Sequence, residues 1–513
     1  MSNLAPTLMV MGTASSVGKS LLVTGLGRAL SRRGIRVAPF KAQNMALNSY
    51  VTAAGLEIGR AQAVQAEACK ALCDIRMNPV LLKPEGERTS QVVINGKVQA
   101  SMSAAEYHQM KPQLRELIVD SLNSLRADYD VVLIEGAGSP AEINLKSQDI
   151  VNMFVAQAVE SPVILVGDID RGGVFASFVG TWALLSPEER GLIKGFVINK
   201  FRGDLSLLTP GYSDLLERTG IPVLGTLPYL RDLRVAEEDS LALDRRPNGF
   251  YGRGDEIIDI AILRLPRLSN YDEFQPLEYE NDVWVRYVSH PRELKGAHLV
   301  IVPGSKKTLS DLRWMRERGF FEALKQRADR GERIMGVCGG CQILGESISD
   351  PLGVEGEVCD KELGVGLLPV STHFEKEKVV ARVKFSTTGF GFFADAAGSR
   401  FGHGYEIHMG RLIAQKNSAQ YGKLKILERN GEKYQGLEGA VSADGMTIGT
   451  LIHGLFEDDG LRQGFLDSLR LQLNIPSQSM HVNQKEEAYN RLADAIDQSL
   501  DCEMIDQLIS RNL

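Results

Sequence analysis

The sequence predicts an α/β protein made of two doubly wound, mostly parallel-sheet domains. Three observations support this fold class. The chain has 513 residues, which is more than one hydrophobic core usually covers. Short apolar runs that end in glycine or polar residues alternate with helical patterns through the first half of the chain. The same alternation restarts after a charged segment that contains several glycines.

The composition is that of an ordinary soluble globular protein, with 43% hydrophobic and 24% charged residues. A net charge of −7 argues against a general affinity for nucleic acid or anionic membranes. No apolar run is long enough to cross a bilayer, and the N-terminus lacks a basic segment followed by an apolar one, so we expect a cytoplasmic protein. Six cysteines in so long a chain do not make a disulfide framework.

The first motif is a glycine loop between an apolar strand at Leu8–Val10 and an apolar helix pattern. Backbone N–H groups of such a loop surround a phosphate, while Lys19 reaches the outer phosphates and the Ser20 hydroxyl binds Mg²⁺. The first glycine lies one residue earlier than the strict pattern requires, which leaves Thr13 where the pattern has glycine. The residues expected to bind ATP here are Gly12, Thr13, Gly18, Lys19 and Ser20.

Three more polar side chains follow apolar strands of the same predicted sheet. In a doubly wound sheet, ligands gather at the carboxyl ends of the strands. We therefore expect Lys41 to face the phosphates, Glu135 to hold Mg²⁺ or its water, and Asn199 to read a purine base. Apolar runs at 162–167 and 222–228 complete the first sheet.

Two of these motifs resemble a known family. The stretch GTASSVGKS is similar to the phosphate loop of dethiobiotin synthetase, and EGAGSP resembles the EGAGG loop of that family. Dethiobiotin synthetases activate a carboxylate with ATP, and Lys41 falls where they have a catalytic lysine. The resemblance implies a P-loop NTPase-like domain over residues 1–235, which uses ATP and Mg²⁺ and has no tightly bound organic cofactor.

Charged residues and glycines cluster between Arg231 and Asp255, which makes this segment the best domain boundary. Apolar strands then follow at 257–263, 284–288 and 298–302. The expected divisions are a linker over 236–255, a second domain over 256–460 and a helical tail, 461–513, packed on that second domain.

The chemical centre of the second domain is Cys338, at a glycine turn between a predicted strand and helix. Such a turn projects the sulfur, and the helix N-terminus favours the thiolate. His453, at the end of another apolar segment, supplies a base. Gly304 and Ser305 are expected to give backbone N–H groups to an oxyanion. Gly340 leaves room for a substrate carbonyl.

An alternative interpretation treats Cys338 and Cys341 as a redox pair or half of a zinc site. The chain has no second CxxC, and His453 has no companion ligand at zinc-finger spacing. We therefore favour a nucleophilic role for Cys338 and a packing role for Cys341.

The run G-V-C-G-G-C-Q, which ends at Gln342, resembles the nucleophile elbow of class I glutamine amidotransferases. This resemblance places Gly304, Ser305, Gly340 and Gln342 in the glutamine site. Those enzymes usually carry a glutamate two residues after the histidine, whereas this chain has Leu455. The sequence leaves open which group orients the His453 ring.

Longer stretches, among them KAQNMALNSYVT, DIDRGGVFAS and LPRLSNYDEF, resemble the cobyric acid synthase family over nearly the whole chain. That family lacks the usual third catalytic member. The resemblance implies amidation of the b, d, e and g carboxylates of adenosylcobyrinic acid a,c-diamide in cobalamin biosynthesis. Each amidation uses ATP and glutamine and passes through an acyl phosphate. A sheltered path for ammonia between the domains is expected.

The implied partners are small molecules, glutamine and a corrinoid, without nucleic acid or membrane. One alternative is a cobyrinic acid a,c-diamide synthase or another glutamine-dependent carboxylate amidase, although LPRLSNYDEF favours the first interpretation. A more distant alternative is a P-loop partition or maturation ATPase. The acidic composition and the cysteine-containing half argue against it.

Overall fold

The structure is a computed structural model that describes residues 4–85, 88–230, 233, 257–356, 358–393, 401–414, 423–476 and 484–510. The predicted linker, 236–255, lies outside the described residues. The chain divides into two compact units, and each is discontinuous in sequence. The first unit comprises Met1–Ala46, Ile58–Asp239 and Asn483–Leu513, and the second comprises Leu47–Glu57 and Ser240–Val482.

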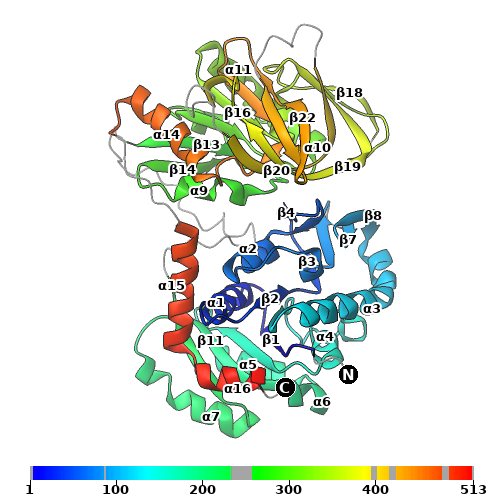
Figure 1. The fold of residues 1–513 in the computed structure, drawn as a ribbon, viewed down its shortest axis with the longest axis vertical. Helices are drawn as coiled ribbons and strands as arrows, with labels where there is room; N and C mark the ends of the chain where they lie inside the picture. The colour runs from blue at the N-terminus through cyan, green and yellow to red at the C-terminus, as the bar shows by residue number, and fades with distance from the viewer. Residues whose placement is uncertain are drawn as a thin grey trace. The chain divides into compact units, whose positions relative to one another are not determined.

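The first unit is built on a six-stranded parallel sheet (Figure 1). Its strands form because near-continuous apolar runs are buried on both faces. In spatial order they are β12 (Val223–Pro228), β11 (Ile193–Phe201), β10 (Val163–Asp168), β1 (Thr7–Gly12), β9 (Val131–Glu135) and β2 (Val37–Phe40). Every strand predicted for this sheet is present.

Helices connect these parallel strands, as crossover connections require. The longest, α3, begins at a capping box formed by Ser103 and Glu106. The helices are α1 (Lys19–Arg32), α2 (Arg60–Ala68), α3 (Ala104–Asp128), α4 (Met153–Ala158), α5 (Val174–Ala183), α6 (Pro187–Leu192) and α7 (Pro210–Thr219).

A second, four-stranded sheet in this unit has the order β3-β6-β7-β8. Its strands are β3 (Gln43–Met45), β6 (Val80–Pro84), β7 (Thr89–Ile94) and β8 (Lys97–Ser103). The chain leaves this sheet after β3, forms the paired strands β4 (Ser49–Val51) and β5 (Glu57–Gly59), and returns to α2.

The last two helices also belong to the first unit. Helices α15 (Gln484–Ser499) and α16 (Cys502–Ser510) bury their apolar faces in the same cluster as α1 and β1. Ion pairs join Arg32 of α1 to Asp494, and Arg33, the residue after α1, to Asp506.

The prediction that the whole tail, 461–513, packs on the second domain is therefore wrong for α15 and α16. Their apolar stripes fit α1 and the edge of β12, where Leu500 forms an antiparallel bridge with Gly225. Among the described helices of the tail, α14 (Asp459–Leu473) is the one that packs in the second unit, where Phe465 and Leu466 are buried.

The second unit has a six-stranded sheet in the order β14-β13-β15-β16-β24-β23. All neighbours pair in parallel except β23 with β24. The strands are β13 (Ile258–Leu263), β14 (Val283–Val288), β15 (Leu299–Val302), β16 (Arg333–Val337), β23 (Ala440–Val441) and β24 (Thr447–Thr450). Helices α9 (Gln275–Glu278), α10 (Thr308–Glu317), α11 (Phe320–Asp329) and α12 (Gly339–Leu344) lie between strands along the chain.

A seven-stranded, mostly antiparallel sheet, which was not among the predicted elements, completes this unit. Its longest strands are β19 (Val370–Ser386) and β20 (Phe401–Ala414). The others are β17 (Ser347–Asp350), β18 (Cys359–Leu363), β21 (Leu424–Arg429), β22 (Glu432–Glu438) and β25 (Ile452–His453).

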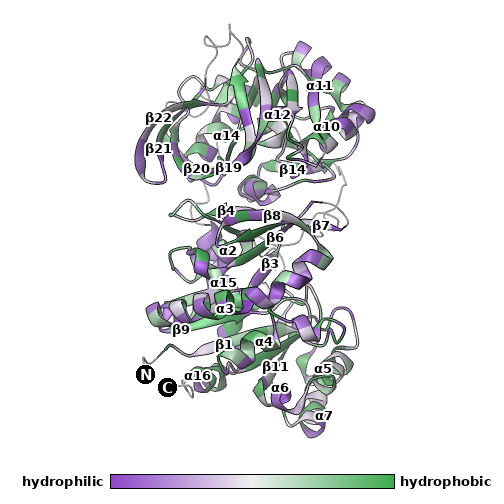
Figure 2. Ribbon diagram, turned by 90° about the vertical axis from the view of Figure 1, so that its right-hand side faces the viewer, coloured by the Kyte–Doolittle hydropathy of each residue, from purple (hydrophilic) through white to green (hydrophobic). Residues whose placement is uncertain are grey.

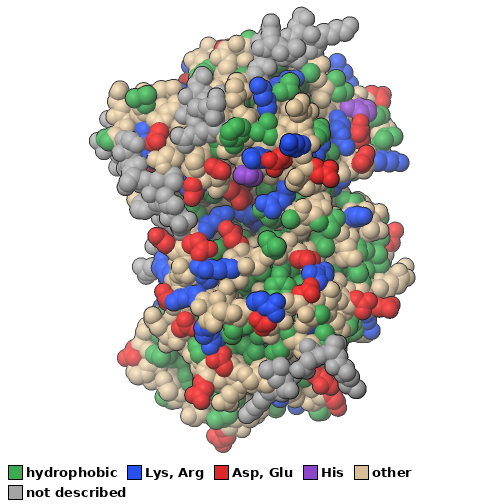
Figure 3. Space-filling model, in the orientation of Figure 1, with side chains coloured by type: hydrophobic (Ala, Val, Ile, Leu, Met, Phe, Trp, Pro, Cys, Tyr) green, Lys and Arg blue, Asp and Glu red, His purple; other side chains and the backbone are tan. Residues whose placement is uncertain are grey.

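Hydrophobic residues concentrate in the strands, while α3, α10 and α11 alternate hydrophilic and hydrophobic residues (Figure 2). Among the described helices, none combines the length and the apolar character that crossing a membrane requires. On the face shown in Figure 3, lysine and arginine side chains are interspersed with aspartate and glutamate over both units.

Candidate active sites

The loop between β1 and α1 has the shape that a phosphate site needs. A Cβ on Gly12 would lie 2.6 Å from Val17, and Gly18 has a φ of 104°, so both positions require glycine. Lys19 Nζ donates to the backbone oxygens of Ala14 (3.1 Å) and Gly138 (3.0 Å). Thr13 donates its backbone N–H to Val166 of β10, which anchors the loop to the sheet.

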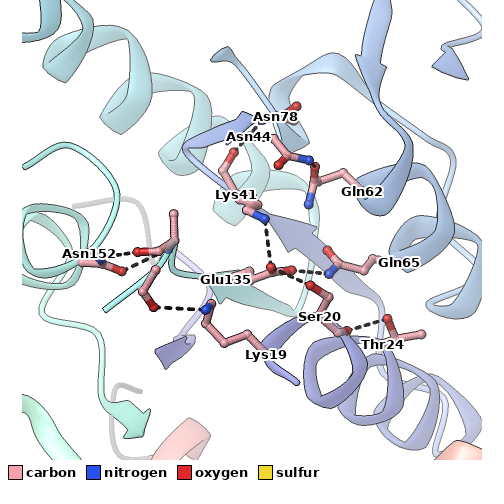
Figure 4. A network of polar contacts seen from close by, with 12 residues as sticks. Lys19, Ser20, Thr24, Lys41, Asn44, Gln62, Gln65, Asn78, Glu135 and Asn152 are labelled. Atoms are coloured by element: carbon pink, nitrogen blue, oxygen red, sulfur yellow. Dashed lines mark hydrogen bonds and ion pairs between the residues drawn. The ribbon is translucent and has the colours of Figure 1, made fainter. Parts of the chain in front are cut away.

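Glu135, at the end of β9, is the centre of a buried polar network (Figure 4). Its Oε1 accepts hydrogen bonds from Ser20 Oγ (2.8 Å) and Lys41 Nζ (2.9 Å). Its Oε2 accepts one from Gln65 Nε2 (2.5 Å). Burial alone raises a carboxyl pKa, but the Lys41 ammonium and these hydrogen bonds hold the pKa of Glu135 below its ordinary value. The carboxylate is therefore charged.

The structure thus brings together Lys41, Glu135 and Ser20, which the sequence assigned to different strands and loops. It adds Gln65, from α2, which sequence reasoning missed. A glutamine at a buried helical position carries no motif, and only the placement of α2 reveals its role. Asn44 and Gln62 lie nearby, with Asn44 Nδ2 donating to Gln62 Oε1 (2.9 Å).

Asn199 lies beside the phosphate loop and stabilises it through a hydrogen bond. Its Nδ2 donates to Val17 O (2.8 Å), and its Oδ1 accepts from the Lys200 backbone N–H (2.8 Å). Lys200 Nζ bonds both Ser16 O (2.7 Å) and the carboxylate of Asp168 (2.8 Å). Both ends of the Asn199 amide are thus used within the protein, and its predicted reading of a purine base stays a prediction.

Cys338 sits at the predicted sharp turn between β16 and α12. Its φ of 49° and ψ of −109° are strained for a residue other than glycine. The turn is possible because its flanking glycines admit close backbone contacts. A Cβ on Gly340 would lie 1.8 Å from Val302 O, and one on Gly336 would lie 2.7 Å from the Cys341 nitrogen. Cys341 is fully buried, which raises the pKa of its thiol.

His453 lies against Cys338, and a glutamate orients its ring. His453 Nδ1 is 2.9 Å from Glu273 Oε1, and Glu273 Oε2 accepts the Gly454 backbone N–H (3.0 Å). Burial opposes the imidazolium, but the Glu273 charge and a contact with Cys338 raise the pKa of His453 to about 10. Glu273 therefore makes the ring a stronger base, and in its neutral form the ring carries its proton on Nδ1.

Glu273 answers the question that Leu455 left open in the sequence. It lies in a short 3₁₀ turn, Tyr271–Phe274, far from His453 in sequence. The residue belongs to the LPRLSNYDEF stretch, so a signal was present. No spacing rule connects that stretch to the histidine, because the carboxylate approaches from a different loop.

Gly304 lies next to His453, and Ser305 lies next to the turn that carries Cys338, while their donation to an oxyanion stays a prediction. A Cβ on Gly304 would lie 3.2 Å from His453 Cε1. The bridge between Leu268 and Ser305 uses Gly304 O and the Lys306 N–H. The Ser305 N–H therefore faces the other way, and a Cβ on Gly339 would lie 2.9 Å from it.

Gln342 is buried in α12, one turn beyond the nucleophile. Thr308 Oγ1 donates to Gln342 Oε1 (3.4 Å), and a Cβ on Gly410 would lie 2.3 Å from Gln342 Nε2. Behind His453, the buried Glu438 accepts hydrogen bonds from Thr450 Oγ1 and the Leu451 N–H, which hold the turn before the histidine.

Two family descriptions match the chain. The CobQ/CobB/MinD/ParA nucleotide binding domain matches residues 8–243, and the CobB/CobQ-like glutamine amidotransferase domain matches residues 259–461. A nucleotide-binding unit and a glutamine amidotransferase unit on one chain define an ATP-dependent, glutamine-hydrolysing ligase.

The chain belongs to the cobyric acid synthase family. The cobyric acid synthase of Sorangium cellulosum is 51% identical over 98% of this chain and 99% of that protein. The cobyric acid synthase of Dehalococcoides mccartyi is 47% identical over the full length of both. Among solved structures, PurLQS from Thermotoga maritima is 19% identical, with a TM-score of 0.31, over 41% of this chain and 98% of that one.

Proposed function

We propose that the chain converts the b, d, e and g carboxylates of adenosylcobyrinic acid a,c-diamide into primary amides, in the cytoplasm. The observation that carries this proposal is the Cys338–His453–Glu273 arrangement in a chain whose other unit holds a P-loop beside Lys41 and Glu135. The family membership supplies the corrinoid substrate.

In the nucleotide-binding unit, the loop amides and Lys19 are proposed to hold the phosphates of ATP. The oxygens of Ser20 and Glu135 are adjacent, and such hard oxygen ligands suit Mg²⁺. The metal would neutralise phosphate charge as the γ-phosphoryl group moves to a substrate carboxylate. Lys41 adds a positive charge beside Glu135 at the same place.

In the glutaminase unit, His453 takes the thiol proton and Cys338 Sγ attacks the side-chain amide carbon of glutamine. Ser305 and Gly339 donate backbone N–H groups to the resulting oxyanion. The carbon–nitrogen bond breaks as His453 returns the proton to the leaving ammonia. Water then hydrolyses the thioester, which releases glutamate and regenerates the thiol.

Ammonia must reach the acyl phosphate before water does. Attack of ammonia on the acyl carbon forms the amide and expels inorganic phosphate, whereas attack of water returns the carboxylate. A sheltered route from Cys338 to the site of phosphoryl transfer therefore belongs to this proposal.

Two other interpretations are weaker. A cobyrinic acid a,c-diamide synthase shares this chemistry but accepts other carboxylates, and both relatives compared above are named cobyric acid synthase. A P-loop partition ATPase would give no role to a buried cysteine, histidine and glutamate that meet in the second unit.

High-resolution mass spectrometry of the corrinoid product tests the proposal. The protein is incubated with the a,c-diamide, ATP, Mg²⁺ and glutamine, and hydroxyl-to-amino exchanges are counted against glutamate released. Four exchanges with matching glutamate are expected. An unchanged corrinoid would overturn the proposed substrate, even with glutamine still hydrolysed.

Two variants separate the sites. Cys338→Ala is expected to abolish glutamine-dependent amidation and to retain amidation with added ammonium. Lys19→Ala is expected to stop amidation with either nitrogen source. If Cys338→Ala loses both activities although it folds, the two-site mechanism is wrong.

A further inference from the structure

One segment of the glutaminase unit comes from the middle of the nucleotide-binding sequence. Residues Leu47–Glu57, here called the inserted segment, belong to the second unit, although Met1–Ala46 and Ile58–Asp239 belong to the first. Its strand β4 contacts β19 and β20 of the antiparallel sheet. The buried ion pair between Glu57 and Lys378 of β19 fixes its end.

The inserted segment reaches His453 through Asn270. The Ser49 backbone N–H donates to Asn270 Oδ1 (2.9 Å), and Asn270 Nδ2 lies 3.4 Å from His453 Nε2. A backbone N–H can only donate, so it fixes the orientation of the Asn270 amide. The amide oxygen must face Ser49, and the amide N–H must face the histidine. Asn270 itself is in the left-handed region (φ 53°), which asparagine tolerates.

The inserted segment also reaches His453 through packed aromatic rings. The Tyr50 ring lies edge-on to Tyr405, with centroids 5.3 Å apart. Tyr405 in turn stacks on the His453 imidazole at 5.3 Å and 18°. Val51 packs in the same buried cluster as Tyr405 and Ile407. The inserted segment therefore supports both the ring plane of His453 and the donor that faces its Nε2.

We infer that Asn270 is a positioning residue of the glutaminase, and that the inserted segment holds its side chain in place. Because the segment continues into the nucleotide-binding sequence at both ends, it makes glutamine hydrolysis depend on the state of the nucleotide site. Glu273 holds the ring proton on Nδ1, and the Asn270 N–H favours an unprotonated Nε2. Nε2 is the atom that must accept the Cys338 proton, and the thiol replaces the long, 3.4 Å contact with Asn270 when it transfers that proton. The inference rests on the proposed function, because it assigns His453 the role of the base.

The residues that flank the inserted segment give the nucleotide-binding unit a way to affect the glutaminase unit. Lys41 precedes the segment and Gln65 follows it, and both side chains bind Glu135. A change at Glu135 when ATP and corrinoid bind can therefore displace the segment through the chain itself. Glutamine hydrolysis is expected to accelerate when both substrates are present.

Asn270→Asp tests the positioning role. The variant keeps an acceptor for the Ser49 N–H but replaces the donor facing Nε2 with a carboxylate oxygen. We expect glutamate release to fall by about tenfold or more. The pH profile of Cys338 alkylation by a glutamine-like diazoketone is expected to shift, because a second carboxylate favours the imidazolium. A wild-type rate and profile would overturn the role of Asn270.

Asn270→Gly is the second variant if Asn270→Asp does not fold, because glycine adopts the same backbone conformation. It removes the donor altogether and is expected to slow glutamate release similarly. An unchanged rate in the folded glycine variant would also overturn the inference.

Tyr50→Ala and Glu57→Gln test the inserted segment, with Ala53→Ser at its exposed turn as the matched control. Both variants are expected to lose the acceleration of glutamate release by ATP and corrinoid, while ammonium-dependent amidation stays near the wild-type rate. Retained acceleration in both variants would refute the role of the segment. A wild-type protein without ammonium-dependent amidation would instead refute the proposed function, and the glutamate measurements would still stand.

Discussion

His453 is a buried histidine whose two ring nitrogens face different kinds of group. Glu273 holds Nδ1 and favours the imidazolium, which raises the pKa of the ring, while Cys338 lies on the other side. A buried imidazole without such a carboxylate would have a lowered pKa and would be a poor base. The basicity of the site therefore depends on one side chain from a distant loop.

Glu273→Gln is expected to reduce glutamine hydrolysis by about 100-fold or more. The amide keeps the shape of the carboxylate but removes its charge, so the pKa of His453 falls and Nδ1–H is no longer favoured over its tautomer. Glutamate release measured from pH 6 to about 10 checks this. Ammonium-dependent amidation and the melting temperature serve as controls. A wild-type pH profile would exclude Glu273 from the mechanism.

Asp311 supports the predicted oxyanion loop and gives the fold a pH dependence. Its Oδ2 accepts from Ser305 Oγ (2.6 Å), while its Oδ1 is buried without a hydrogen-bond partner in the described part of the chain. Burial raises the pKa of Asp311 to about 7, although the Ser305 hydroxyl opposes this. In the unfolded chain the pKa is about 4.

The folded chain therefore binds more protons at Asp311 than the unfolded chain between pH 4 and about 7. The contribution of this group to the free energy of unfolding is largest below pH 4 and decreases as the pH rises to about 7. Asp311→Asn should remove this part of the pH dependence, as measured by urea unfolding at several pH values. The exposed Asp360→Asn is the control. Equal pH dependence in wild type and Asp311→Asn would contradict the assignment.

Among the secondary-structure elements, α15 shows how the end of the chain stabilises the first unit. Its residues Leu492 and Ile496 lie over Gly25 of α1, where a Cβ would meet Ile496 Cγ1 at 2.8 Å. Glycine thus permits a close approach of the two helices. Arg28 and Arg32 of α1, and Arg33 directly after it, add ion pairs to this C-terminal region.

Ile496→Ala is expected to lower the free energy of unfolding of the first unit by about 2–5 kcal/mol. The side chain is fully buried, so its removal leaves a cavity between α15 and α1. Urea unfolding combined with hydrogen exchange of β1 and β9 amides measures the effect. Gln498→Ala, at an exposed position of the same helix, is the control. Loss of exchange protection confined to the second unit would contradict the role of α15 in stabilising the first unit.

For the whole molecule, the path of the chain matters as much as the two folds. The sequence passes from the first unit to the second at Leu47, returns at Ile58, leaves again for the glutaminase and comes back at Asn483. Neither unit is a single continuous piece of sequence. Cutting the chain at one linker would therefore not separate the two activities into independently folding fragments.

Mixing two inactive variants tests whether ammonia stays within one molecule. Lys19→Ala retains the glutaminase site, and Cys338→Ala retains the nucleotide site. If ammonia follows a sheltered route, the mixture should form less than about one tenth of the wild-type amount of amide per glutamate released at neutral pH, where released ammonia is protonated. Product amide is measured by mass spectrometry alongside glutamate, with added ammonium as the positive control. A ratio of amide to glutamate near that of the wild type would mean that ammonia diffuses freely between molecules.

The sequence by itself determined the features of this protein whose shape depends only on residues close together along the chain. The phosphate loop around Lys19 and the turn around Cys338 are local backbone shapes that glycines at fixed spacing allow, so the motifs identified them. The resemblance to the cobyric acid synthase family, confirmed by the full-length relatives, also came from the sequence. The parallel sheets followed from buried apolar runs.

Only the tertiary structure decided which distant residues meet. Glu273 reaches His453, Gln65 reaches Glu135, and Ser49 reaches Asn270 because separate loops and helices converge there. The packing of α15 on α1 was likewise beyond the sequence, since an apolar helical stripe shows that a face is buried but not against what. Contacts of this kind arise from packing among whole elements, and no local spacing encodes them.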